Sequence, residues 1–345
     1  MQVLHQEIIL LVIDVLLVHV YSDLKKYTKG WQTMKIGIST CLLGENVRYD
    51  GGHKLDRYLR DLLGMYVTYV PVCPETESGL PVPREAMRLV GDVENPRLVT
   101  IKTRVDHTKR LEQWSRRKLD ELEKENLCGF IFKSRSPSSG MERVKIYSEK
   151  GHPIPKGRGV FAGMFMDRFP LLPVEEDGRL HDPQLRENFI ARIFVFNRWR
   201  EILETGLTTG SLVEFHTKHK LLLMAHNVAA YRELGRMVAK ARDYEPDELA
   251  HEYITRLMSA LKLSSTVKKN VNVLHHVMGY FKKELSSDEK QELLETIKNY
   301  ADYLIPIIVP ITLLNHYVRK YNKTYLQEQV FLSPHPMELK LRNHV

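Results

Sequence analysis

Two patterns of hydrophobic and polar residues divide the chain. Between residue 35 and about residue 174, short apolar runs alternate with helix-like segments, which is typical of a parallel or mixed β-sheet covered by helices. From residue 211 onward, apolar residues recur at the helical period, which indicates helices only. The sequence therefore predicts a Rossmann-like α/β domain followed by an all-α helical bundle domain.

The same patterns predict the domain boundaries. We expect an α/β domain at 34–184, a linking helix within 185–210 and an all-α domain at 211–345. A charged helix near 108–126 should cover the sheet with one solvated face. The helices expected in the all-α part are 212–242, 246–263, 266–285, 287–301 and 310–321. The tail after residue 332 contains prolines, which favours an extended strap.

Residues 1–33 form a separate N-terminal segment. Its apolar run, 8–21, contains Asp14 and His19 and is shorter than the ~20 residues that span a bilayer. It also lacks the basic stretch and cleavage site of a secretory signal, so no membrane partner is expected. Two interpretations stay open: the segment lies upstream of a true start at Met34, or it forms an added amphipathic helix.

Composition narrows the class of protein. A chain of 345 residues that is 43% hydrophobic can bury at least one good core. The net charge of +8 suits RNA as a partner, but basic and acidic residues are interleaved, so a solvated basic surface explains the charge as well. Three cysteines without a Cys-x-x-Cys pair form neither a disulfide framework nor a zinc site, which points to the cytoplasm.

Three predicted strands end in loops that carry reactive side chains. Strands at 35–40, 66–72 and 128–133 lead into Cys41, Cys73 and the loop 134–141. Because ligands bind beyond the carboxyl ends of strands in an open α/β sheet, we expect these loops to meet. Cys128 begins its strand, and six residues at ~3.3 Å each place it ~15–20 Å from the far end, outside the site.

Two thiols that converge in a reducing compartment suit a soft metal or an iron–sulfur cluster. The alternative is that Cys41 and Cys73 are small buried hydrophobic residues, as free cysteines often are. Composition alone favours this alternative.

Three motifs, in order, resemble the thiouracil desulfurase family of iron–sulfur enzymes. The first is Ser-Thr-Cys-Leu-Leu-Gly at 39–44 with Val-Arg-Tyr-Asp-Gly at 47–51, and the second is Val-Cys-Pro-Glu at 72–75 with Gly-Leu-Pro-Val-Pro-Arg at 79–84. The third is Lys-Ser-Arg-Ser-Pro-Ser-Ser-Gly at 133–140. Residues from about 211 to 332 resemble a second domain of unknown function, of the YbgA type, which is often fused to the first.

The resemblance implies a 4Fe-4S cluster held by three cysteines, with one iron open to the sulfur of a thiolated nucleobase. Cys41 and Cys73 match two of these ligands, but Ser139 stands where the family has cysteine. Serine is a harder and less acidic ligand than a thiol, so cluster affinity should fall. Three outcomes stay open: a cluster with Ser139 as ligand, a labile cluster with an external ligand, or a site that has lost its metal.

Polar residues of the same motifs are candidates for catalysis and substrate binding. We expect Glu75 and Asp50 to act in acid–base chemistry, and Ser136 and Ser138 to donate hydrogen bonds. A turn-forming role for Asp50 is an equal alternative, since a glycine follows it. Three arginines are candidates for holding the polar edge of a base or a phosphate, with surface ion pairs as the alternative: Arg48, Arg84 and Arg135.

Histidines gather in the helical part, but no carboxylate stands at a spacing that is diagnostic of a metal site. We interpret them as core or surface side chains rather than ligands: His216, His219, His226, His275 and His276.

The leading hypothesis is a cytoplasmic iron–sulfur desulfurase, an enzyme that cleaves the C–S bond of a thiouracil-like nucleobase or a related small thioamide. The alternative is a nucleic-acid-binding or adaptor protein with RNA as its partner and a vestigial cluster site.

Overall fold

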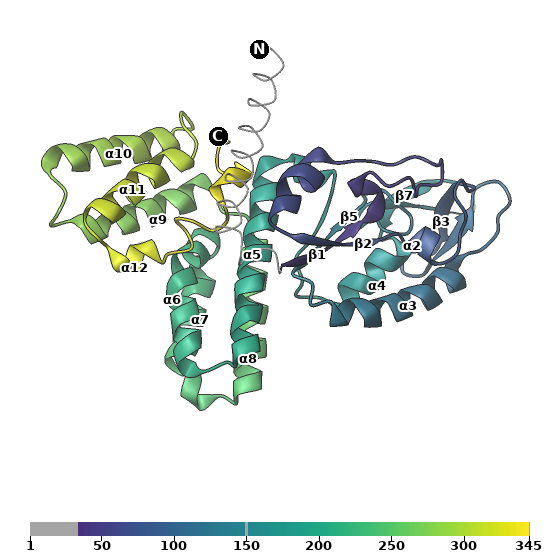
Figure 1. The fold of residues 1–345 in the computed structure, drawn as a ribbon, viewed down its shortest axis with the longest axis horizontal. Helices are drawn as coiled ribbons and strands as arrows, with labels where there is room; N and C mark the ends of the chain where they lie inside the picture. Colours follow the sequence, from purple (N-terminus) through teal and green to yellow (C-terminus); the bar gives the residue numbers. More distant parts are fainter. Residues whose placement is uncertain (1–33, 149–150, 345) are drawn as a thin grey trace, which may run out of the picture.

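The computed structural model describes residues 34–148 and 151–344, so the predicted extension 1–33 lies outside the described residues. One long helix, α5 (Pro183–Thr205), stands between an α/β part and a part made of helices (Figure 1). The predicted fold class is confirmed by this arrangement.

Four strands form a parallel sheet in the order β2-β1-β5-β8. They are β1 (Lys35–Ser39), β2 (Thr68–Val72), β5 (Gly129–Phe132) and β8 (Val174–Glu176). Gly37 of β1 lies against Phe130 of β5, where a Cβ atom would meet the ring at 2.2 Å. Because β1 is flanked by two parallel neighbours, the loops that follow β1, β2 and β5 leave the sheet at one edge.

A second, mixed sheet has the order β4-β3-β6-β7, in which only the β3–β6 pair is parallel. Its strands are β3 (Met87–Gly91), β4 (Pro96–Thr100), β6 (Val144–Tyr147) and β7 (Pro153–Gly157). The sequence predicted runs near β4 and β6 only. The strand β7 escapes detection because two of its five residues are prolines, which have no backbone N–H and are tolerated at a sheet edge.

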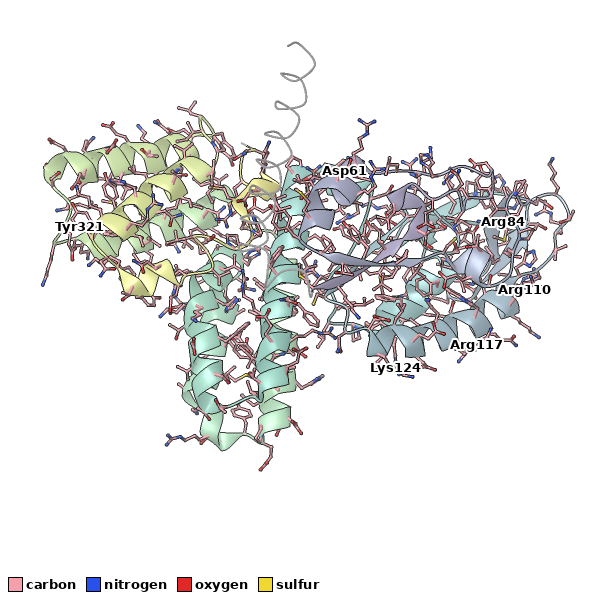
Figure 2. All side chains as sticks on the ribbon, viewed as in Figure 1. Asp61, Arg84, Arg110, Arg117, Lys124 and Tyr321 are labelled. Carbon is pink, nitrogen blue, oxygen red and sulfur yellow. The ribbon has the colours of Figure 1, made fainter. Side chains whose placement is uncertain are left out.

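Helices α3 (Thr108–Lys124) and α4 (Val160–Arg168) cover the parallel sheet through aromatic side chains. Phe130 of β5 lies 4.7 Å from Phe165 of α4, and Trp114 of α3 lies 5.5 Å from Phe161, measured between ring centroids. Such rings supply much of the buried apolar surface of a core. The outer face of α3 is solvated, as predicted, and carries Arg110, Arg117 and Lys124 (Figure 2).

Helix α5 contributes to two hydrophobic cores. Asp182 caps its first turn by accepting hydrogen bonds from the backbone N–H groups of Gln184 (2.9 Å) and Leu185 (3.0 Å). Phe189 and Ile193 pack into the α/β core, whereas Trp199 packs into the helical core. The predicted linking helix is therefore present, and the exact domain boundaries stay a prediction.

The remaining helices pack around one hydrophobic core. They are α6 (Thr209–His226), α7 (Val228–Ala239), α8 (Pro246–Lys262), α9 (Val267–Met278), α10 (Ser287–Ala301), α11 (Ile308–Lys320) and the short α12 (Thr324–Gln327). The prediction of one helix at 212–242 was wrong, because Asn227 interrupts it. The Asn227 side chain caps α7 by accepting from the N–H of Ala229 at 3.0 Å. Within the described residues, no helix has both the length and the hydrophobicity to cross a bilayer.

The C-terminal tail crosses α5 and joins both cores. Phe331 belongs to the helical core, whereas Leu339 and Leu341 belong to the α/β core. Arg342 forms an ion pair with Glu187 of α5 at 2.9 Å. The tail thus contacts both the helical part and the α/β part and connects them.

Candidate functional site

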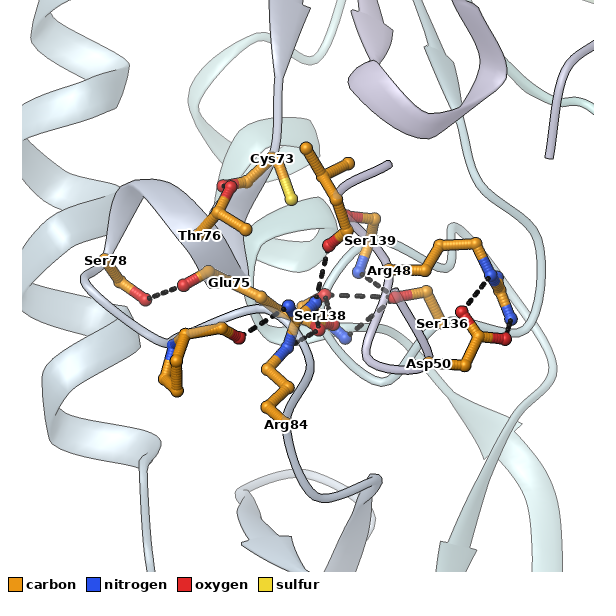
Figure 3. Close-up of polar contacts among 12 residues, drawn as sticks. Arg48, Asp50, Cys73, Glu75, Thr76, Ser78, Arg84, Ser136, Ser138 and Ser139 are labelled. Atoms are coloured by element: carbon orange, nitrogen blue, oxygen red, sulfur yellow. Dashed lines mark hydrogen bonds and ion pairs between the residues drawn. The ribbon is translucent and has the colours of Figure 1, made fainter. Parts of the chain in front are cut away.

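A cavity of about 300 Å³ lies at the carboxyl edge of β1, β2 and β5, where the three predicted loops come together. Figure 3 shows part of this site. Of the predicted site residues, Asp50 alone is not in the lining. Those that line the cavity are Cys41, Arg48, Cys73, Glu75, Arg84, Arg135, Ser136, Ser138 and Ser139.

The three candidate ligands have free side-chain heteroatoms. Cys41 lies in a short 3-10 helix, Thr40–Leu43, and Cys73 directly precedes α2 (Pro74–Glu77). Cys41 and Ser139 are 8% and 5% exposed, and Cys73 is half-buried. Among the described residues, no hydrogen bond engages either sulfur or the Ser139 hydroxyl. Two sulfur atoms and one oxygen therefore remain available to a ligand in the cavity.

Burial raises the pKa of the Cys41 thiol to about 11. The neighbouring Cys73 also raises this pKa, whereas the positive charges of Lys133 and Arg48 lower it. The free protein therefore carries Cys41 as a neutral thiol at pH 7. A metal that binds Cys41 must displace its proton.

The loop that carries Ser139 is fixed by the first turn of α4. This helix has no side-chain cap, and its orphan N–H groups bond to the loop instead, with Val160 donating to the Pro137 carbonyl (3.1 Å) and Phe161 to the Ser138 carbonyl (2.9 Å). Gly159 allows this contact, because a Cβ atom there would lie 2.6 Å from the Ser138 carbonyl carbon. The loop is thus held by backbone contacts.

A chain of hydrogen bonds runs along the cavity from Ser136 to Glu75. The hydroxyl oxygens of Ser136 and Ser138 lie 3.0 Å apart, and the Ser138 hydroxyl donates to Glu75 Oε1 at 2.7 Å. Arg84 Nε donates to the other carboxylate oxygen, Oε2, at 2.8 Å (Figure 3). Two hydroxyl groups thereby connect the cavity to a carboxylate that is already paired with a cation.

Arg84 ties two of the loops together. Besides pairing with Glu75, its guanidinium donates to the carbonyls of Val47 (3.0 Å) and Pro81 (3.2 Å). Each of its nitrogens therefore has an acceptor within the protein. This placement indicates that Arg84 holds Glu75 in position. The sequence had made Arg84 a candidate for contacting the substrate.

Arg48 and Asp50 form an ion pair in the first loop, with Arg48 Nε 3.4 Å from Asp50 Oδ1. The Asp50 carboxylate also accepts from the N–H of Gly52 at 3.1 Å. This backbone hydrogen bond, followed by the contacts with Arg48, lowers the pKa of Asp50. The arrangement matches the turn-forming alternative for Asp50.

Arg135 has a different environment from the other two arginines. It is exposed, adopts a left-handed backbone conformation (φ 59°), and lines both the site and a larger adjoining cavity of about 1030 Å³. No ion pair engages its guanidinium among the described residues. The larger cavity contains further cations and two carboxylates: Arg88, Arg143, Lys145 and Arg179 with Glu142 and Glu176.

Lys133 lines both cavities and was missed as a site residue. Its Nζ lies 2.8 Å from Asp177 Oδ2, and its backbone N–H donates to the Ser39 hydroxyl at 2.9 Å. Burial alone would raise the pKa of Asp177, but hydrogen bonds from Lys133 and Ser134 outweigh it and lower this pKa. The position of Lys133 directly after β5 was the signal that could have identified it.

Cys128 lies at the opposite end of β5 from the site. It is buried, and its sulfur contacts Asn197 Oδ1 of α5 at 3.4 Å. The helical histidines also stay apart from the cavity: His216 bonds to the Tyr253 hydroxyl (3.0 Å) and His219 to the Phe215 carbonyl (2.7 Å). The described residues contain no group of three His, Cys, Asp or Glu side chains placed for one metal ion.

Two family models match separate parts of the chain. The model of 2-thiouracil desulfurase matches residues 36–177, and that of a protein of unknown function (DUF1722) matches residues 220–336. The solved structure of TudS, a [4Fe-4S]-dependent thiouracil desulfidase, is 27% identical and covers 43% of this chain and 94% of its own, with a TM-score of 0.35.

A curated relative matches nearly half of this chain. The uncharacterized protein YbgA of Escherichia coli (strain K12) is 30% identical over 158 residues, which are 46% of this chain and 94% of YbgA. The chain therefore belongs to the family of YbgA, and it joins a region that matches the 2-thiouracil desulfurase model to a helical region that matches DUF1722.

Proposed function

We propose that this chain is an iron–sulfur-dependent desulfurase that acts on a thiolated nucleobase such as 2-thiouracil, or on a related small thioamide. The observation that carries the proposal is that Cys41, Cys73 and Ser139, whose side-chain heteroatoms are free of hydrogen bonds in the described chain, line one cavity. The match of residues 36–177 to the 2-thiouracil desulfurase family supports it.

The donor set fits a 4Fe-4S cluster. Cys41 and Cys73 supply soft sulfur ligands, and the unbonded Ser139 hydroxyl supplies the third donor as an alkoxide. When bound, a cluster with three protein ligands supplies a thiophilic iron with an open position for the sulfur of a C=S group. The serine makes this a weaker site than one with three thiols, because oxygen is the harder donor.

The proposed reaction is a hydrolysis without net oxidation or reduction. The oxygen of a water molecule forms a bond to the C=S carbon, the C–S bond breaks, and the sulfur leaves as hydrogen sulfide. 2-Thiouracil and water thus give uracil and hydrogen sulfide, and both protons of the water must be transferred during the reaction.

The hydroxyl pair provides a path for the first of these protons. Ser136 faces the cavity, its hydroxyl lies 3.0 Å from that of Ser138, and Ser138 donates to Glu75. A proton released by water at Ser136 can therefore move along both hydroxyls to the Glu75 carboxylate. Arg84 fixes the orientation of Glu75 and compensates its charge while this carboxylate is ionised.

Arg135 and Lys133 are the cations available to the polar atoms of a base. Arg135 has no competing carboxylate in the described part of the chain, and the Lys133 ammonium is held at the boundary of both cavities by Asp177. Each can donate a hydrogen bond to the carbonyl oxygen of the ring and so orient the C=S group.

The test is desulfuration by anaerobically reconstituted protein. We expect 2-thiouracil to yield equal amounts of uracil and sulfide, with loss of activity in Cys73→Ala and full activity in the control Cys128→Ala, whose thiol lies outside the cavity. Iron-loaded protein that leaves 2-thiouracil and 4-thiouracil intact contradicts the proposal. Salt-sensitive RNA binding that survives Cys41→Ala and Cys73→Ala, without desulfuration, would instead support the nucleic-acid-binding alternative.

A further inference from the structure

A cavity of about 500 Å³ lies between the α/β part and the helical part, separate from the thiol site. Its walls come from the end of α3, the segment that follows α4, and the helices α5 and α8. Figure 1 shows α5 between the two parts of the molecule. The volume is within the range of sites that enclose small organic ligands.

Most of the lining is apolar and partly aromatic. Leu127 and Leu172 are buried, whereas Leu171, Phe169 and Phe196 are only partly buried and present apolar surface to the cavity. Packing normally removes such side chains from water. Two phenylalanine rings and four leucines around one cavity indicate a ligand with a flat hydrophobic body.

One lining residue, Arg200 of α5, lacks a counter-charge. No carboxylate lies within 4.0 Å of its guanidinium among the described residues, and its buried Nη1 has no hydrogen-bond acceptor there. Glu204 acts on it from a greater distance, and the guanidinium lies 5.4 Å from the Phe196 ring. Arg200 is partly buried, and removing a cation from water without such partners costs free energy.

The neighbours of Arg200 do not supply the missing charge. Arg200 contacts the Cys128 thiol, but burial raises the pKa of that thiol to about 11, so it is neutral at pH 7. Glu123, which also lines the cavity, is paired with Arg168 at 2.6 Å. The hydroxyl of Thr255, on the wall formed by α8, is buried without a partner as well.

We propose that this cavity is a binding site for a small aromatic carboxylate, with the ring among Phe169, Phe196 and the leucines and the carboxylate against Arg200. A carboxylate supplies the negative charge that Arg200 lacks within the protein. Its two oxygens match the planar donor edge of a guanidinium. The aromatic ring of the ligand fills the apolar part of the cavity. The site is independent of the desulfurase proposal, because none of its residues lines the thiol cavity.

Two matched probes separate charge from hydrophobicity: 2-naphthoate and its neutral analogue 2-naphthamide. With the full chain, we expect calorimetry to give saturable 1:1 binding of 2-naphthoate and about tenfold weaker binding of the amide. Arg200→Gln should weaken 2-naphthoate about tenfold and leave the amide unchanged. Arg200→Lys, which keeps the charge, should restore most of the affinity.

Two control variants locate the site. Arg135→Ala must leave 2-naphthoate binding unchanged. Weaker binding in this variant would show that 2-naphthoate binds in the basic cavities beside the thiols, which Arg135 lines. Arg232→Gln, an exposed change on α7, reports the effect of net charge alone. If Arg200→Gln does not fold, Leu171→Trp, which fills the cavity and keeps the cation, must abolish binding.

Three results would overturn the inference. They are no binding of 2-naphthoate at ~1 mM, equal affinity for the acid and the amide, and undiminished binding in folded Arg200→Gln or Leu171→Trp.

Discussion

The hydroxyl of Ser138 donates a hydrogen bond to the carboxylate of Glu75 over 2.7 Å, although the two residues stand 63 positions apart. Ser138 follows β5 and Glu75 follows β2, so the bond joins the loops on either side of the central strand β1. Ser138 is 1% exposed, which keeps this contact away from bulk water. The last step of the proposed proton path, from Ser138 to Glu75, depends on this hydrogen bond.

Ser138→Ala should therefore lower kcat by roughly 100-fold, the usual contribution of one acid–base group, while the iron content stays the same. Steady-state kinetics with 2-thiouracil, beside iron analysis of the same sample, gives both quantities. The matched control is Ser259→Ala, an exposed serine in α8. If Ser138→Ala keeps the wild-type kcat, the proton does not move through the Ser138 hydroxyl.

Arg84→Gln should destabilise the protein by about 3 kcal/mol, because it leaves the Glu75 carboxylate largely buried without its cation. Urea unfolding of the metal-free protein measures the change. Arg60→Gln is the control: its ion pair with Asp61 is solvent-exposed, so no change in the midpoint is expected. Equal midpoints for both variants would show that the Arg84–Glu75 pair has no structural role.

The raised pKa of Cys41 predicts a pH-dependent reactivity in the metal-free protein. Only the thiolate reacts with iodoacetamide, and the thiolate fraction grows about tenfold per pH unit until the pH nears the pKa of about 11. Mass spectrometry of the Cys41 peptide after timed labelling follows this rate. A plateau near pH 8.5, where unfolded thiols titrate, contradicts the burial of Cys41.

Arg135→Ala should raise KM for 2-thiouracil about tenfold and change kcat little, because Arg135 lines the cavity without contacting the Ser138–Glu75 pair. The variant should keep wild-type thermal stability, since its guanidinium has no ion-pair partner in the described chain. A loss confined to kcat would assign Arg135 to the chemistry rather than to substrate binding.

The meeting of the three loops could be predicted from the sequence because it depends only on strand direction. Once the strands before Cys41, Cys73 and Ser134 are parallel neighbours, their carboxyl ends must lie at one edge. The distance of Cys128 from that edge follows from the rise per residue in the same way.

Other features depend on side-chain contacts that a single sequence does not encode in its periodicity. The pairing of Arg84 with Glu75 follows from the path of the loop between them, not from their spacing. The break before α7 arises because the Asn227 side chain caps the next helix, whereas the apolar pattern continues across it. The second sheet was only half predicted: β3 and β7 were missed, and β7 contains two prolines that argue against a strand.

The central claim is that Cys41, Cys73 and Ser139 hold an iron–sulfur cluster, and its most direct test is iron and sulfide analysis after anaerobic reconstitution and desalting. We expect about four iron and four sulfide per wild-type chain, a strong loss in Cys73→Ala, and slower loss of iron in air for Ser139→Cys than for the wild type. Equal iron in the wild type and Cys73→Ala, or no iron in the wild type and Ser139→Cys alike, would contradict the claim.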